Sequence, residues 1–460
     1  MNPVLPGDLS RAFTGLRLRT TPDEIAAFVS DESSLVGDPP LVVVSPRTVP
    51  EVQQAMRVAT EHRLPVVPRG AGTGLSGGAC AVSGSVLLDL SRMTTITELD
   101  PQARLAVVEA GVVNADVSTA AAQYGLMYAP DPSSWESSTI GGNIATNAGG
   151  LRCARYGATR ASVLGLDVVL SDGRLLSTGG RTVKRSAGYD LTQLFIGSEG
   201  TLGVVVGATL RLLPLPPPQL TALATFPDVK SAALAAAALV ATTSPTLVEL
   251  MDELVVSALD QARGTGFGPS VGSVLVLQVD DAPAAQASIS TAMAVGNAID
   301  VAVTSDQGEA AELLNIRRAT FAALQRLGPL LLEDVCVPVT HLAAMVSAVA
   351  EIGAAHGVRT CTVAHAADGN LHPVIVRDGH TRAEEAAADA IFRQAQALGG
   401  TVSGEHGIGR LKRHWLETEL GEVALDIQRN IKQTLDPLGL LNPGAVIRAS
   451  AASLPPGHRE

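Results

Sequence analysis

The chain has 460 residues, of which 46% are hydrophobic and 17% charged, and its formal net charge is −12. This length and composition predict a globular protein of two or three domains and exclude a disordered chain. The acidic balance, without any run of basic residues, argues against nucleic acid as a partner.

Alternating short strands and helices are predicted in the first half of the chain. Helices are expected within residues 21–62 on both sides of the strand LVVVSP, and the strands LPVVP and SVLLDL follow. The strand LGVVVGATLRLLP ends near residue 214, where the Pro-rich stretch LPLPPPQ predicts a linker. We therefore expect an N-terminal α+β domain over residues 1–215.

A second α+β domain is predicted after the linker. An Ala-rich helix, SAALAAAALVA, is followed by the strand SVLVLQVD and by helices near 308–326 and 341–356. The apolar run at 232–241 is too short to span a bilayer, although peripheral contact with a membrane stays open. The tail, which contains IKQTLDPLGLLNPG, predicts a helix and a turn.

The four cysteines do not suggest a metal cluster. None belongs to a CxxC pair, so iron–sulfur and zinc-ribbon spacings are excluded. Few cysteines, together with an N-terminus that lacks the apolar stretch of a signal peptide, favour a cytoplasmic protein.

A glycine-rich loop, PRGAGTGLSGG, occupies residues 68–78 after a predicted strand. It contains a GxGxxG match, but a Rossmann fingerprint must open a long helix, and the residues that follow are β-rich. We therefore exclude a Rossmann site. Bare backbone N–H groups in such a loop can surround an anion such as a diphosphate. The alternative is a flexible surface loop.

Two further stretches of small residues have the same character. They are DPSSWESSTIGGNIATNAGGLRCARYG at 131–157 and GSEGTLGVV at 197–205. Three such loops around one extended ligand predict a large dinucleotide.

The segment HAADGNLH, residues 365–372, contains two of the nine histidines. Asp-Gly is a strong signal for a two-residue β-hairpin turn, which would place His365 directly opposite His372. Directly opposite Cβ atoms lie about 5 Å apart, so the two imidazoles could share one metal ion. The alternative is a surface hairpin with two solvated histidines.

Seven motifs in order, covering nearly the whole chain, resemble one family. The three small-residue loops resemble the FAD-binding domain of the vanillyl-alcohol-oxidase (PCMH-type) flavoproteins. EDVCVP, HAADGNLHP, SGEHGIGRLK and LDPLGLLNPG resemble the FAD-linked D-2-hydroxy-acid dehydrogenases, which include the catalytic FAD subunit of glycolate oxidase and D-lactate dehydrogenases. The resemblance implies an α+β protein. Its FAD-binding domain would comprise residues 1–215 and a returning C-terminal segment, 406–460. A cap domain, 216–405, would carry an antiparallel sheet covered by helices and the metal site.

The resemblance also implies the residues that hold FAD, without a covalent bond. One group would wrap the diphosphate, a second would line the isoalloxazine and ribityl side, and a third would hold the adenosine side, with one further residue approaching from the C-terminal segment. These are, in that order, Pro68, Arg69, Gly70, Ala71, Gly72, Thr73, Gly74, Leu75 and Ser76; Ser133, Ser134, Thr139, Gly142, Asn143, Ala148 and Gly149; Glu199, Gly200 and Val205; and Asn442.

The same resemblance implies a metal-assisted mechanism. His365, His372 and Glu405 would bind a divalent metal, Zn²⁺ first, with Mn²⁺ or Fe²⁺ as alternatives. His406 would take the hydroxyl proton while the α-hydride passes to flavin N5. Glu405 and His406 are neighbours, which in a regular strand point to opposite faces, so both can line one site only if the backbone turns at the nearby glycines.

The substrate contacts are less determined. Arg317 matches the family position that clamps a substrate carboxylate. The alternatives are that Arg318 is the clamp, or that Arg317 is an exposed helical arginine without a role in binding. Asn370 would touch substrate or cap the hairpin turn. The segment PLLLED lacks the Lys of the 2-hydroxyglutarate enzymes, and Phe321 stands where those enzymes carry Thr. Both departures favour a small or apolar substrate, such as D-lactate, glycolate or an aliphatic analogue.

Three rival functions remain at this level. They are a transferase like alkylglycerone-phosphate synthase, a non-catalytic FAD-binding partner subunit, and an oxidase that reduces O₂. A dehydrogenase would need an external acceptor, namely a quinone, a cytochrome, an electron-transfer flavoprotein or an iron–sulfur subunit. A homodimer stays open, and we expect the protein in the cytoplasm or at the inner face of the membrane.

Overall fold

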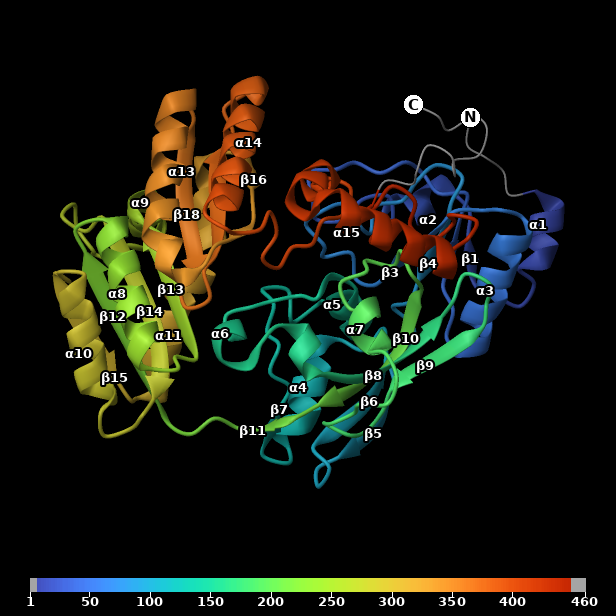
Figure 1. Cartoon of the computed structure of the whole chain (residues 1–460), viewed down its shortest axis with the longest axis horizontal. Coiled ribbons are helices and arrows are strands. Elements are labelled where there is room, and N and C mark those ends of the chain that lie inside the picture. The colour runs from blue at the N-terminus through green and yellow to red at the C-terminus, as the bar shows by residue number, and fades with distance from the viewer. Residues whose placement is uncertain (1–5, 448–460) are drawn as a thin grey trace. The chain divides into compact units, whose positions relative to one another are not determined.

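The computed structural model describes residues 6–447, which fall into two compact units (Figure 1). The first unit is Met1–Gly150, Ala158–Leu215 and Glu405–Glu460; the second is Leu151–Gly157 and Pro216–Gly404. The division lies at the Pro-rich linker and one residue before the expected return at 406.

Residues 151–157 differ from the expected division, because they belong to the second unit. They form the short helix α6 (Cys153–Tyr156). Arg155 of this helix donates through Nη2 to Asp280 at 2.7 Å and through Nη1 to Thr246 at 3.2 Å. This ion pair attaches the segment to the sheet of the second unit.

The first unit contains a four-stranded sheet in the order β1-β2-β4-β3. The strands are β1 (Leu18–Arg19), β2 (Val42–Val44), β4 (Val86–Asp89) and β3 (Val66–Arg69). β2, β4 and β3 are parallel to one another, and such strands are buried on both faces, which explains their continuous apolar sequences. Helix α3 (Val49–Glu61) begins at Thr48, whose side chain caps Glu51 N, and packs on this sheet.

A second sheet of the first unit has the order β5-β6-β10-β8-β9 and is antiparallel. Its strands are β5 (Ile96–Asp100), β6 (Leu105–Glu109), β10 (Val204–Arg211), β8 (Val163–Val169) and β9 (Leu175–Gly179). Helices α4 (Asn114–Ala122) and α5 (Ile140–Thr146) contribute to its core.

The C-terminal segment returns to the first unit. Ile431 and Leu435 of helix α15 (Arg413–Leu435) pack against the core of the second sheet. Leu441 forms a parallel bridge with Val66 of β3. This part of the chain therefore completes the first unit, although the long segment Pro216–Gly404 of the second unit precedes it.

The second unit contains one large antiparallel sheet, with the order β15-β12-β14-β13-β18-β19-β16 and β17 paired to β19 (Figure 1). The strands are β12 (Gln219–Phe226), β13 (Leu247–Asp252), β14 (Ser273–Asp280), β15 (Asp300–Thr304), β16 (Leu330–Leu332), β17 (Val335–Cys336), β18 (Arg359–His365) and β19 (Asn370–Val376).

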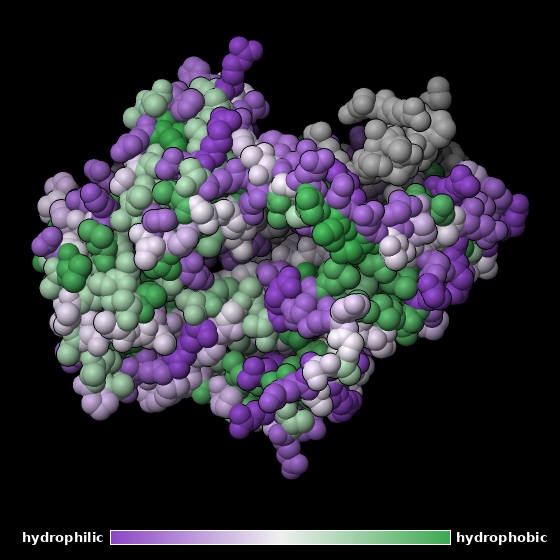
Figure 2. Space-filling model, in the orientation of Figure 1, coloured by the Kyte–Doolittle hydropathy of each residue, from purple (hydrophilic) through white to green (hydrophobic). Residues whose placement is uncertain are grey.

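Helices cover both faces of this sheet. Helices α9 (Glu253–Arg263) and α12 (Thr320–Leu324) form a buried core with one face, and α11 (Gln307–Arg318) packs there too. Helices α8 (Val229–Thr242), α10 (Ala285–Val295), α13 (Leu342–His356) and α14 (Thr381–Ala397) pack on one another and on the sheet. The surface over α8 is mostly weakly hydrophobic in Figure 2, as its alanine-rich sequence requires.

The stretch Val339–His356, which includes α13, is long and apolar enough to cross a membrane by length and composition alone. In the second unit this helix packs on α8, α14 and β18. The buried side chains of α13 include Leu342, Met345, Val346 and Val349.

Candidate active site

The first unit contains a cavity of about 1250 Å³, counting its open mouth. Its wall comes from the three small-residue loops, including residues 68–76 and 198–200, together with Glu405 and His406. Every residue that the family resemblance assigned to FAD lines this cavity, except Asn442. The cavity wall extends over three separate loops, as the site of an elongated ligand such as a dinucleotide requires.

The glycines of residues 68–78 are needed for the shape of the cavity. Gly72 has φ +79°, and a Cβ there would lie 2.1 Å from Arg69 Nη2. A Cβ on Gly70 would lie 2.2 Å from Thr139 Oγ1. Within the described residues the next element is β4 rather than a helix, as expected when the Rossmann motif was excluded. A cradle of this kind, without bulky side chains, fits an extended dinucleotide such as FAD.

Glu199 connects the cavity wall to the segment after Glu405. It is 7% exposed, and its carboxylate accepts hydrogen bonds from the backbone N–H groups of Ile408 at 2.7 Å and Gly409 at 2.9 Å. Burial raises the pKa of Glu199 to about 7, although these two donors act in the opposite direction. A carboxyl with this pKa responds to pH near neutrality.

Asn442 differs from the expectation, because it does not line the cavity. Its side chain is held in a buried network, donating to the carbonyls of Gly78 at 2.8 Å and Glu199 at 2.7 Å. Its Oδ1 accepts from Arg410 Nη2 at 2.7 Å. Asn442 therefore supports two cavity-lining residues from behind, and its polar atoms are engaged by the protein.

Glu405 and His406 line the same cavity, which requires the backbone turn inferred from the glycines. Gly407 and Gly409 have φ +83° and +51°. Ser76 Oγ donates to the His406 carbonyl at 2.9 Å, which ties this turn to the first glycine loop. A Cβ on Gly149 would lie 2.2 Å from Glu405 Oε2, so glycine provides the space for that carboxylate.

The histidine hairpin of the second unit has a different register from the predicted one. Residues 366–369 form the turn, so His365 pairs with Asn370, and His372 pairs with Val363. The two-residue turn was therefore wrong. His365 and His372 are diagonal neighbours on one face of the sheet, where large rings still meet. Their ring centroids are 5.1 Å apart, in an edge-to-face arrangement.

Both histidines are buried, with exposed fractions of 6% and 3%, so the alternative of a solvated surface hairpin is wrong. Their ligand nitrogens lie within 4.8 Å of one another. Two imidazoles at this spacing suit a divalent metal of the Zn²⁺, Mn²⁺ or Fe²⁺ type. The third expected ligand, Glu405, belongs to the first unit.

Glu249 of β13 supports His365 and was missed at the sequence level. It is 0% exposed and lies directly opposite His365 in the sheet. His365 Nδ1 lies 2.8 Å from Glu249 Oε1 and 3.0 Å from Oε2. Burial acts to raise the pKa of Glu249, but His365 and Arg317 outweigh it and hold that pKa below its usual range. An ionised carboxylate only accepts hydrogen bonds, so Nδ1 of His365 carries a proton. The acid in the middle of the apolar run TLVELM was the signal that could have revealed it.

Arg317 is the buried member of the arginine pair. It is 6% exposed, so the alternative of an exposed Arg317 is wrong, whereas Arg318 lies on the exposed side of α11. The choice of Arg317 over Arg318 as the clamp stays a prediction. Arg317 Nε donates to Glu249 Oε2 at 2.7 Å. Neither of its Nη groups has a hydrogen-bond acceptor within residues 6–447. A guanidinium held in this way can offer these groups to a carboxylate.

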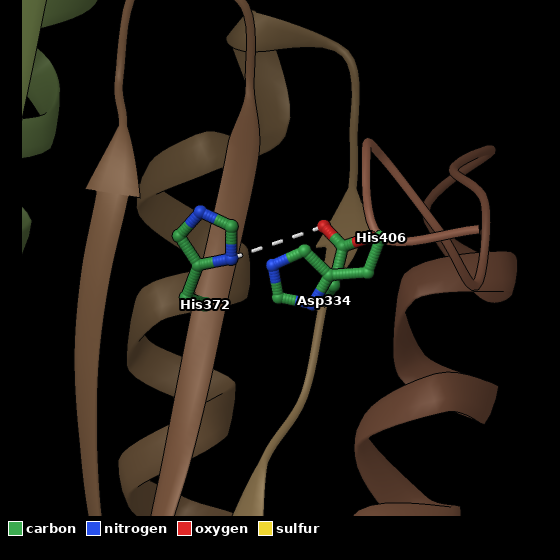
Figure 3. A group of neighbouring side chains, drawn as sticks. All are labelled: Asp334, His372 and His406. Atoms are coloured by element: carbon green, nitrogen blue, oxygen red, sulfur yellow. Dashed lines mark ion pairs between the residues drawn. The ribbon is translucent and has the colours of Figure 1, made fainter. Parts of the chain in front are cut away.

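A second buried acid, Asp334, lies near His372 (Figure 3). The distance from Asp334 Oδ1 to His372 Nδ1 is 3.9 Å. Asp334 also accepts from Asn370 Nδ2 at 3.1 Å and from Ser403 Oγ at 2.9 Å. The Asn370 side chain therefore does not cap the hairpin turn, and its buried Oδ1 has no partner among the described residues.

The loop-lined cavity and its surrounding sheets define the class of the protein, which is an FAD-binding flavoprotein. The chain matches two family descriptions, "FAD binding domain" over residues 40–179 and "FAD linked oxidases, C-terminal domain" over residues 215–446. It is 39% identical to the glycolate oxidase subunit GlcD of Bacillus subtilis (strain 168), over 90% of each chain. It is 36% identical to a D-lactate dehydrogenase of Archaeoglobus fulgidus, over 88% of this chain and 91% of that one.

Solved structures share the fold at low sequence identity. A p-cresol methylhydroxylase structure has a TM-score of 0.77 and 16% identity, and the match covers 96% of this chain and 98% of that one. An alkyldihydroxyacetonephosphate synthase structure has a TM-score of 0.72 and 17% identity, with coverage of 96% and 85%. The chain belongs to the FAD-linked oxidase family, and it is an FAD-dependent oxidoreductase with the α+β fold predicted from sequence.

Proposed function

We propose that the protein oxidises a small D-2-hydroxy acid, such as D-lactate, glycolate or an aliphatic analogue, to the 2-oxo acid. The main support is the agreement between two relatives. One is named as a glycolate oxidase subunit and the other as a D-lactate dehydrogenase, and the chain covers about nine-tenths of each. Both substrates are short 2-hydroxy acids.

His406 is the proposed base for the substrate hydroxyl. It lines the same cavity as the FAD-binding loops, and an imidazole titrates in a range suited to proton transfer at neutral pH. When bound, FAD supplies the acceptor N5 for the α-hydride, and a divalent metal supplies a positive charge that favours loss of the hydroxyl proton.

His365, His372 and Glu405 are the proposed metal ligands, for Zn²⁺ first and for Mn²⁺ or Fe²⁺ as alternatives. The support lies in the donor set of the second unit, because the two histidines are buried neighbours and Glu249 occupies Nδ1 of His365. The ring nitrogen that would bind the metal is then Nε2. Glu405 follows directly after the last residue of the second unit.

Arg317 is the proposed clamp for the substrate carboxylate, and Asn370 a proposed further contact. The Phe321 ring centroid lies 5.9 Å from Arg317 Cζ, at the position where the 2-hydroxyglutarate enzymes carry Thr. The strand β16 before Glu333 is LLL, without a lysine. Both features favour a substrate with a single carboxylate.

The electrons are proposed to leave through an external acceptor, which would be a quinone, a cytochrome, an electron-transfer flavoprotein or an iron–sulfur subunit. None of the four cysteines forms a disulfide bond, and their spacing is not that of a cluster-binding motif. A relative named as a subunit supports an acceptor on another chain. The proposed location is the cytoplasm or the inner face of the membrane, where such acceptors lie.

The first test is anaerobic reduction of the purified flavoprotein. We add four acids separately, namely D-lactate, L-lactate, glycolate and D-2-hydroxyglutarate. The absorbance of the oxidised flavin band is followed at about 450 nm. We expect D-lactate or glycolate to bleach the band, D-2-hydroxyglutarate to be slower, and prior chelation to abolish the reaction. Re-oxidation by O₂ distinguishes an oxidase from a dehydrogenase.

Bleaching by a D-acid that survives thorough chelation would remove the metal from the mechanism and leave the oxidation in place. A yellow protein that no 2-hydroxy acid reduces would contradict the proposed function. It would leave the transferase and the non-catalytic subunit as the functions to test next.

A further inference from the structure

Glu249 is a charged residue inside an apolar strand of the second unit. Its neighbours along β13 are buried, and the carboxylate is itself 0% exposed. Its Oε2 accepts a hydrogen bond from Arg317 Nε, and both of its oxygens lie within hydrogen-bond distance of His365 Nδ1. Burying a carboxylate in such a place costs several kcal/mol unless it is paired, and an apolar pair of similar volume often gives a more stable protein.

The two partners of Glu249 come from distant parts of the chain. His365 is its direct partner in the register of β13 and β18, whereas Arg317 reaches it from the last turn of α11. The carboxylate is therefore shared between a residue of the metal site and a residue of the substrate clamp.

We propose that Glu249 is a positioning residue that fixes the tautomer of His365 and the direction of the Arg317 guanidinium at the same time. This inference rests on the proposed function for the roles of those two partners. Glu249 touches neither substrate nor cofactor in this scheme.

The geometry assigns each of the two partners the group with which it would bind. The Nδ1–H of His365 donates to Glu249, so the lone pair stays on Nε2, as metal-binding histidines require. Arg317 uses Nε for Glu249, so its Nη groups are left for the substrate carboxylate in a fixed fork. Loss of one carboxylate should therefore weaken metal binding and substrate binding together.

The competing explanation is a structural ion pair, and the second unit offers a matched control for it. Glu384 also has 0% side-chain exposure, and it accepts from Arg377 Nε through Oε2 at 2.9 Å, where Glu249 accepts from Arg317 Nε through Oε2 at 2.7 Å. Its other hydrogen bonds come from the backbone of Asp378 and Gly379 rather than from a histidine.

The test compares Glu249→Gln with Glu384→Gln in the full-length holoprotein. A glutamine has a single acceptor oxygen, so it cannot accept from both Arg317 Nε and His365 Nδ1 without placing its NH₂ group against one of them. Zn²⁺ and Mn²⁺ affinities are measured by calorimetry after chelation, and KM and kcat with D-lactate. The tautomer of His365 is followed by ¹⁵N-histidine NMR of the metal-free protein, with His365→Gln to assign its signal.

For Glu249→Gln we expect about a 10–100-fold loss of metal affinity, the range of losses for partners of metal ligands, a rise in KM, and movement of the His365 proton from Nδ1 to Nε2. For Glu384→Gln we expect a lower melting temperature with unchanged metal affinity, KM and tautomer. The proposal is overturned if Glu249→Gln behaves like Glu384→Gln.

A second variant provides a test in case Glu249→Gln does not fold. Glu249→Leu combined with Arg317→Met removes the buried cation along with its counter-charge and leaves Nδ1 of His365 without this acceptor, so the Nδ1–H tautomer should still be lost. Because this readout needs neither metal nor substrate, it separates the two hypotheses. A wild-type protein that binds no metal and oxidises no hydroxy acid would refute the proposed function, while an unchanged tautomer in both variants would refute the role of Glu249.

Discussion

The cavity of the first unit and the histidine site of the second unit are built in opposite ways. The cavity is lined mainly by glycines and small residues, so backbone and empty space make most of its wall. The histidine site consists of buried ionisable side chains that interact with one another. Glu249 is hydrogen-bonded to His365, and Asp334 lies near His372. The first arrangement recognises a ligand by shape and backbone N–H groups, and the second by charge and direction.

This difference predicts how each region can be damaged. A site made of backbone fails when atoms are added, because a new Cβ fills the space of the ligand or of its support. A site made of paired charges fails when one member is removed, because its partner loses its orientation and a buried charge is left uncompensated. The predictions below test this contrast, from the largest expected effect to the smallest.

The largest effect is expected for His406→Ala. The cavity should keep its FAD, because the shape of its wall hardly changes, while flavin reduction by D-lactate should slow by at least about a hundredfold, the scale of lost general-base catalysis. Stopped-flow absorbance measures the rate, and His414→Ala, at an exposed position of α15, is the control. Normal reduction in His406→Ala would remove this residue from the base role.

His365→Ala should lower the affinity for a divalent metal by about a hundredfold, at the upper end of what lost support of a metal site costs. The flavin content should stay unchanged, because FAD is assigned to the other unit. Elemental analysis and the flavin spectrum of one preparation measure both quantities. His380→Ala, at an exposed position in the same unit, serves for comparison. Equal metal content in the wild type, His365→Ala and His380→Ala would contradict the ligand assignment.

Gly72→Ala should reduce FAD affinity by about tenfold, equivalent to about 1.4 kcal/mol. The added Cβ would stand 2.1 Å from Arg69 Nη2 and push this side chain, which lines the cavity, out of place. Gly84→Ala is the matched control, since Gly84 has a similar φ of +71° with nothing within 4 Å of a Cβ. Both variants should lose stability from backbone strain, and only Gly72→Ala should lose flavin. Equal flavin retention would show that the loop tolerates the added atom.

Arg317→Lys should raise KM for D-lactate by about fivefold with a smaller change in kcat, which corresponds to about 1 kcal/mol for one lost hydrogen bond. A lysine keeps the charge next to Glu249 but cannot form a planar fork. Arg318→Lys, one residue further and exposed, should leave KM unchanged. Steady-state kinetics with both variants decides whether the fork matters, and an unchanged KM in Arg317→Lys would rule it out.

The smallest effect is expected from the pH dependence of Glu199. Burial raises its pKa to about 7. The folded state therefore binds this proton more tightly than the unfolded chain does. The stabilisation is fully present below the usual carboxyl pKa and is lost as the pH rises through about 7. The melting temperature of the apoprotein should fall by a few degrees across this range in the wild type, and by less in Glu199→Gln. Parallel melting curves against pH for the two proteins would contradict the assignment.

The two regions also differ in how much of them could be predicted. Residues 68–78 were assigned to a dinucleotide from sequence because the glycines and the absence of a following helix are local features. The turn at Glu405 and His406 could also be predicted from local sequence, because Gly407 and Gly409 follow closely and both have positive φ. Asn442 was placed at the ligand, but its amide is engaged by the carbonyls of Gly78 and Glu199, contacts between segments more than 200 residues apart.

The second unit shows what pairing of distant strands adds. The Asp-Gly signal predicted a hairpin and a histidine pair, and the hairpin exists, but with residues 366–369 in its turn. The predicted and observed registers differ by two residues, which is one whole side-chain period, so both histidines still lie on one face of the sheet. Glu249 entered the site through pairing of β13 with β18, which no local pattern around residue 249 specifies.

The sequence by itself determined the family, the α+β class, the small-residue loops that line the cavity and the proximity of the histidine pair, because these depend on motifs whose meaning lies in adjacent residues. The tertiary structure decided which of Arg317 and Arg318 is buried, that Asn370 binds Asp334 instead of capping a turn, and that Glu249 connects His365 to Arg317. The physical reason is that strand register and helix docking set these contacts, and both are determined by burial of the whole sheet rather than by the residues nearby.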